Sequence, residues 1–79
     1  MKLNMATKNK GRITLQKLLW CKIRYYQMLH NITDDTLATT LEVNRRTLTT
    51  YDKDSGNITL AKVDRFLFVN RITLEELLK

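Results

Sequence analysis

The same two-part signal for a helix start occurs five times along this chain of 79 residues. Each time, a β-branched apolar residue directly precedes Thr or Asn, and Leu or Val follows four positions after that Thr or Asn. Thr or Asn at an N-cap accepts a hydrogen bond from a first-turn N–H, and the apolar pair around it can form a hydrophobic staple. The five signals are Ile13-Thr14 with Leu18, Ile32-Thr33 with Leu37, Val43-Asn44 with Leu48, Ile58-Thr59 with Val63, and Ile72-Thr73 with Leu77.

Apolar residues at three- and four-residue spacing follow each of these starts. We expect helices at about 14–30, from 33, from 44, at 59–70 and from 73. A turn over 54–57 and a left-handed Asn31 that ends the first helix separate some of them. The side chains expected to face the core are Leu15, Leu18, Leu19, Ile23, Tyr26, Leu29, Leu37, Ala38, Leu41, Leu48, Tyr51, Leu60, Val63, Phe66 and Leu67.

The second and third starts lie so close together that only about two helical turns and a tight corner fit between them. Two short helices joined by a tight corner form the helix-turn-helix unit. In DNA-binding proteins this unit places its second helix in the major groove. The spacing therefore makes DNA binding a candidate function.

The net charge is +6, and residues 1–24 carry seven Lys and Arg without an acidic residue. A basic domain favours a polyanion, of which nucleic acid is the commonest. A solvated basic face that keeps a small protein soluble explains the charge equally well. We expect residues 1–12 to form a flexible basic arm and residues 13–79 to form one domain.

Several classes of protein are disfavoured by the residue inventory. Cys21 is the only cysteine, and His30 is the only histidine, so neither a disulfide nor a metal site is expected. There is no Gly-rich phosphate loop, no long apolar run and no signal-peptide pattern. We expect a cytoplasmic protein that is not an enzyme, with no cofactor, metal, small-molecule ligand or membrane contact.

Residues 33–52, TDDTLATTLEVNRRTLTTYD, resemble the helix-turn-helix of the lambda-repressor-like (Cro-type, XRE) DNA-binding domains. Ala38 matches the small residue at which the two helices cross. Val43, Leu48 and Tyr51 match the anchors of the recognition helix. Residues 57–60 and 71–78 resemble the start of the family's fourth helix and its ending.

The resemblance covers about residues 19–78 and implies an all-α, compact five-helix domain with the helix-turn-helix at its second and third helices. It also implies sequence-specific binding of double-stranded DNA by a small, repressor-like transcriptional regulator. The recognition helix would span about 45–53. The small size suits a phage or mobile-element regulator.

Three positions depart from the family pattern. Glu42 replaces the usual Gly of the turn, where a side chain costs on the order of 1 kcal/mol, so an altered turn stays open. Asp34 replaces a phosphate-binding Gln. Gln27 and Asp52 occupy the places of a buried Arg–Glu pair, and we expect a neutral hydrogen bond between them.

The outward residues at the start of the third helix are the expected base readers. These are Arg45, Arg46, Thr49 and Thr50. One arginine is expected to bond guanine and the other to hold phosphate, against the alternative of a solvated pair. The expected phosphate contacts are Thr33, Asn44, Lys53, Asn57, Lys8, Lys10 and Arg12, although capping, turn chemistry or a disordered tail would also explain several of them.

Two questions stay open at this point. The same fold could serve as a protein-interaction module for another regulator or a polymerase subunit, because Asp34, Asp35 and Glu42 flank the recognition helix. A homodimer, through the fifth helix or the side of Trp20 and Met28, would predict a palindromic DNA site. Phe68 is a further candidate for a partner surface.

Deleting residues 1–10 tests the basic arm. If its lysines neutralise phosphates, the slope of log K against log salt should fall by about 0.9 for each lost contact. Affinity for duplex DNA measured over a salt series checks this, and an unchanged slope would remove the arm from the mechanism.

Overall fold

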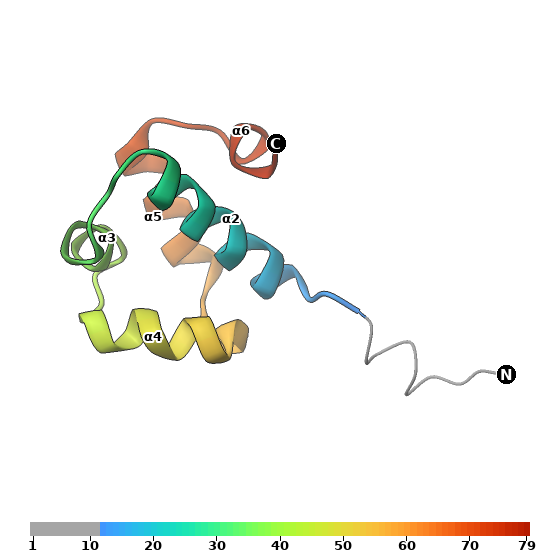
Figure 1. The fold of residues 1–79 in the computed structure, drawn as a ribbon. Coiled ribbons are helices and arrows are strands. Elements are labelled where there is room, and N and C mark those ends of the chain that lie inside the picture. The colour runs from blue at the N-terminus through green and yellow to red at the C-terminus, as the bar shows by residue number, and fades with distance from the viewer. Residues whose placement is uncertain (1–11) are drawn as a thin grey trace, which may run out of the picture.

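The computed structural model describes residues 12–79, which form five α-helices and one 3₁₀ turn without a strand (Figure 1). The helices are α2 (Leu15–Leu29), α3 (Asp34–Leu41), α4 (Arg45–Lys53), α5 (Leu60–Asn70) and α6 (Leu74–Leu78), and the turn η1 (Ser55–Asn57) follows α4. The predicted compact, all-helical class is confirmed for this part of the chain. None of these helices is both long enough and apolar enough to cross a membrane.

All five predicted N-caps are present. The side-chain oxygens of Thr14, Thr33, Asn44, Thr59 and Thr73 each accept a hydrogen bond from the backbone N–H three residues later. At α6 the cap is reciprocal, because the Thr73 N–H also donates to Glu76 Oε1 at 2.8 Å. Each helix therefore begins where a side chain satisfies a free backbone donor.

Three corners of the fold use left-handed residues other than glycine. Asn31, Glu42 and Arg71 have φ of 55°, 60° and 56° at the ends of α2, α3 and α5. The Asn31 prediction is confirmed. The sequence left open whether Glu42 would alter the conformation of the turn after α3. Glu42 adopts the left-handed conformation that a Gly would take there, in spite of its side chain.

The residue after each left-handed position has two roles. The N–H groups of Ile32, Val43 and Ile72 donate five residues back, to the carbonyls of Gln27, Ala38 and Leu67, at 2.9, 3.0 and 3.1 Å. These bonds close Schellman motifs. The same three side chains pack against the core just before the next N-cap. One residue thus ends one helix and fixes the entry of the next.

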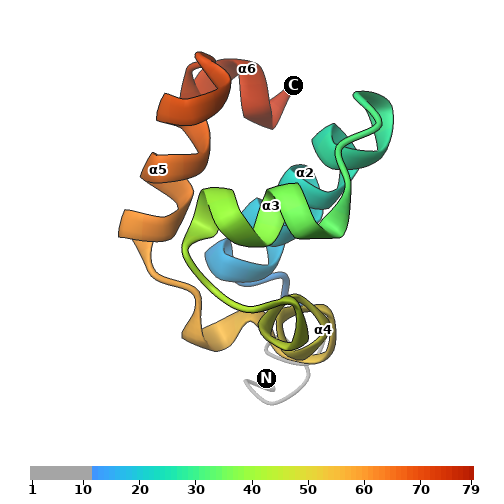
Figure 2. The same ribbon diagram turned by 90° about the vertical axis from the view of Figure 1, so that its left-hand side faces the viewer.

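The core is built from buried side chains of all five helices. α3 packs against α4 and α5, while α2 packs against α6 and η1. The largest fully buried side chains are Phe66, Ile23, Leu37, Leu41 and Leu48. α4 and α6 lie at opposite ends of the molecule in both views (Figure 1 and Figure 2).

The buried face of α2 differs from the predicted one. Leu15, Leu18 and Leu29 were expected in the core but are exposed, whereas Trp20, expected outside, is only 3% exposed. The Trp20 ring packs edge-on against Tyr51 with centroids 5.1 Å apart, and Asp52 accepts its indole N–H. Because the indole finds both an apolar neighbour and an acceptor, α2 is rotated to bury Trp20.

One further burial prediction is wrong. Leu60, the first residue of α5, is 67% exposed. Ile13 is also exposed, so the first of the five staple pairs adds little to the core. Both residues lie at helix starts, where no neighbouring element covers the side chain. Met28 and Phe68, expected outside, are exposed.

Replacing Thr59 with Ala should lower the free energy of unfolding by about 1 kcal/mol, because the first turn of α5 loses its acceptor. Thr59→Ser keeps the hydroxyl and should retain most of the stability. Chemical denaturation of both variants checks this. Equal stability of Thr59→Ala and the parent would contradict the capping role.

Candidate nucleic-acid interface

α4 buries one narrow face and leaves the rest of its surface open. Of its nine residues, only Leu48 and Tyr51 are buried. They lie three positions apart, on one side of the helix. The predicted base-reading residues, Arg45, Arg46, Thr49 and Thr50, are all exposed. The structure therefore brings these four residues together on one accessible surface of α4.

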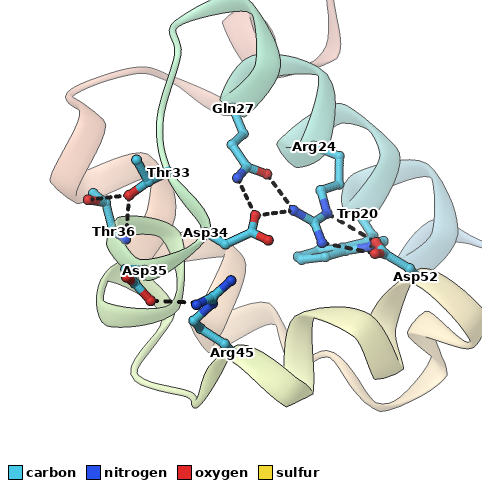
Figure 3. Close-up of polar contacts among 9 residues, drawn as sticks. All are labelled: Trp20, Arg24, Gln27, Thr33, Asp34, Asp35, Thr36, Arg45 and Asp52. Atoms are coloured by element: carbon cyan, nitrogen blue, oxygen red, sulfur yellow. Dashed lines mark hydrogen bonds and ion pairs between the residues drawn. The ribbon is translucent and has the colours of Figure 1, made fainter.

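The orientation of α4 is fixed by Arg24 of α2 (Figure 3). Arg24 Nε and Nη2 donate to Asp52 Oδ1 and Oδ2 at 3.0 and 2.9 Å. Arg24 Nη1 donates to Asp34 Oδ1 at 2.8 Å and to Gln27 Oε1 at 2.7 Å. One guanidinium thus connects α2, α3 and α4.

The prediction of a hydrogen bond between Gln27 and Asp52 is wrong. Gln27 Nε2 donates to Asp34 Oδ1 at 2.7 Å instead. Arg24, which lies about one turn earlier on α2, reaches Asp52 directly and forms a bidentate pair. An ion pair between α2 and the end of α4 is therefore present, and its cation is Arg24 and not the residue at position 27.

The contacts shift the pKa values of the three charged groups. Hydrogen bonds from Gln27 and Arg24 hold the pKa of the Asp34 carboxyl below its ordinary value. Burial would raise the pKa of Asp52, but donation from Arg24 and Trp20 outweighs it and the pKa is lowered. The bond to Asp52 raises the pKa of Arg24. All three groups are therefore held in their charged forms at neutral pH.

Two other acidic residues near α4 pair with arginines. Asp35 Oδ1, in the first turn of α3, lies 3.3 Å from Arg45 Nε. Glu42 Oε2, at the corner before α4, lies 3.4 Å from Arg65 Nη2 of α5. Both pairs are largely exposed. Asp35 and Glu42 therefore each have a cationic neighbour.

The predicted phosphate contacts fall into three groups. Thr33 and Asn44 serve as N-caps, and the Thr33 hydroxyl also donates to Thr36 Oγ1 at 3.0 Å, so its proton is already used. Lys53, the last residue of α4, and Asn57, the last residue of η1, are exposed. Arg12 is exposed before α2, whereas Lys8 and Lys10 lie outside the described residues.

Two residues of this region were missed by sequence reasoning. Arg24 was counted only as part of the basic N-terminal third. Lys17 lines a groove of about 390 Å³ together with Lys53, between the start of α2 and the end of α4. The four-residue spacing of Trp20 and Arg24 was the available signal that both side chains lie on one face.

No family model matches the chain, and no curated protein or solved structure matches it either. The structure thus presents α4 as a short helix that packs on one side, with exposed arginines at its start and two lysines, Lys17 and Lys53, near its end. Such a surface has the charge and the donors to contact an anionic, grooved ligand.

The Arg24 network predicts a pH dependence of stability. Because the pKa values of Asp34 and Asp52 are lowered by folding, their contribution is present above the unfolded value of about 3.9. It is lost as pH falls through the folded values. Asp52→Asn should lower the free energy of unfolding at pH 7 by about 1 kcal/mol, since half-exposed pairs are screened.

Denaturant melts at pH 7 and pH 3 check this prediction. Asp52→Asn should show a smaller loss on acidification than the parent. Asp64→Asn, which alters a carboxylate of α5 outside the network, serves as the control. Equal acid sensitivity of Asp52→Asn and the parent would contradict the role of the network.

Proposed function

We propose that this chain binds double-stranded DNA sequence-specifically and acts as a small transcriptional regulator, with α4 in the major groove. The observation that carries the proposal is the open N-terminal face of α4, with Arg45 and Arg46 on a helix held by Arg24. A rigidly placed recognition helix is what base reading requires. The fold we propose is of the lambda-repressor-like type.

The α3–α4 segment supports this assignment. α3 ends at Leu41 and α4 begins at Arg45, so a corner of three residues joins two short helices. The corner has its left-handed residue at Glu42, and the buried Ala38 lies in α3. Short helices joined in this way are the framework of the helix-turn-helix unit.

The chemistry of the exposed residues fits the edges of DNA bases. Arginine can donate two hydrogen bonds to O6 and N7 of guanine, and the methyl group of Thr49 or Thr50 can contact that of thymine. Lys53, the last residue of α4, and Lys17 of α2, which lines the same groove, suit phosphate contacts that set the register of the protein on the duplex.

Four acidic residues on or beside α4 are paired with arginines. Asp34 shares Arg24 with Asp52, and Asp35 and Glu42 each lie beside an arginine. Residues 12–79 contain eleven Lys and Arg against eight Asp and Glu, and the whole chain is at +6. The remaining field is therefore attractive for a polyanion.

Replacing both Arg45 and Arg46 with Ala should greatly weaken binding to DNA. Loss of the base contact should cost roughly 1–3 kcal/mol, and loss of a phosphate contact should lower the salt slope by about 0.9. Retention of the protein on duplex DNA over a salt series measures both effects.

The matched control removes two cations from the opposite end of the molecule. Arg71→Asn with Lys79→Gln keeps a residue that tolerates left-handed geometry at position 71 and should bind nearly as the parent does. If the parent is not retained on duplex DNA at low salt, the proposal fails and the protein-interaction alternative is favoured. Equal loss in the two double variants would indicate unspecific charge attraction.

A further inference from the structure

We infer that Arg45, and not Arg46, reads a guanine, and that Asp35 positions its guanidinium for this contact. The inference rests on the proposed DNA binding and deepens it. Its basis is the placement of an acidic residue of α3 directly beside the first residue of α4, on the side of the surface that would face DNA.

The pair joins the starts of two helices (Figure 3). Asp35 lies in the first turn of α3, and Arg45 is the first residue of α4. The contact of 3.3 Å joins Asp35 Oδ1 to Nε, the guanidinium nitrogen closest to the chain. The side chains are 76% and 66% exposed, so both are open to a ligand.

Holding Nε leaves the outer edge of the guanidinium free. Nη1 and Nη2 present two parallel N–H groups, which match O6 and N7 of guanine. In water an exposed ion pair contributes little. When DNA covers the pair and excludes water, the attraction between Asp35 and Arg45 strengthens. The carboxylate would then restrict the arginine in the orientation that contacts the base.

Arg46 lacks such a support. Among residues 12–79 no carboxylate lies within ion-pair distance of its guanidinium. Its backbone carbonyl accepts from Thr50 Oγ1, and the exposed guanidinium itself makes no hydrogen bond within residues 12–79. An unrestrained cation suits a phosphate, where charge matters more than orientation. The two adjacent arginines are thus assigned different roles by their surroundings.

A purely structural role for Asp35 makes a different prediction. An acidic residue in the first turn also stabilises α3 through the helix dipole. In that case, replacing Asp35 changes thermal stability and overall affinity but leaves base preference untouched. Base preference at single positions of the site therefore separates the two roles.

The experiment selects bound duplexes from a random-sequence pool with the full chain and its variants Arg45→Ala, Arg46→Ala, Asp35→Asn and Glu42→Gln. Glu42→Gln is the matched control, because it removes the same charge from the corner after α3, where the partner is Arg65. The readout is the preference for each base at each position of the enriched site.

Arg45→Ala should abolish a guanine preference at one position, a loss of about 5- to 150-fold in relative affinity. Asp35→Asn should weaken the preference at that same position by about 2- to 10-fold, as expected for coupled neighbours. Arg46→Ala should weaken binding to all sequences alike. Glu42→Gln should leave every preference unchanged.

The inference is overturned if the parent has a base preference that Asp35→Asn leaves intact, or if Arg46→Ala and not Arg45→Ala removes the guanine. Either result would leave the proposed DNA binding standing. If the parent enriches no sequence, the proposed function itself fails and the inference fails with it.

Discussion

The geometry of α4 depends on the hydrogen bonds that the Arg24 guanidinium donates to Asp52 and Asp34. A helix of nine residues is not stable alone in water, and α4 has only Leu48 and Tyr51 buried. The bidentate pair with Asp52 supplies a directional contact that apolar packing lacks. The Arg24 side chain is 25% exposed and its two acidic partners remain about half open, so the cost of removing these charges from water is moderate.

The short connections between the helices complement the Arg24 network. With helices this short, the residues between them must end one helix and start the next. Ile32, Val43 and Ile72 do both, through a Schellman hydrogen bond and a place against the core. The following Thr or Asn then caps the next helix. Helix directions are therefore set largely by local interactions, and the long-range Arg24 contacts orient α3 and α4 together.

The sequence was sufficient to predict the helix starts because capping is a local interaction between residues three apart. It was insufficient to predict which face of α2 is buried, since a period of three to four residues fits more than one stripe. Trp20 is buried because Tyr51 and Asp52 are there to receive it. The exposed arginines of α4 were predicted from its amphipathic pattern, whereas the contacts of Arg24 and Asp35 depend on distances between helices.

The central claim is that the exposed start of α4, a helix that Arg24 holds through Asp52 near its end, is the surface that meets DNA. NMR of the ¹⁵N-labelled chain, titrated with a duplex at low salt, tests it most directly through backbone amides and arginine Nε–H groups. The account predicts that the largest shift changes fall on residues 44–50 and on the Arg45 side chain, with α6 little affected. Changes concentrated on α5 and α6, or none at all, would contradict it.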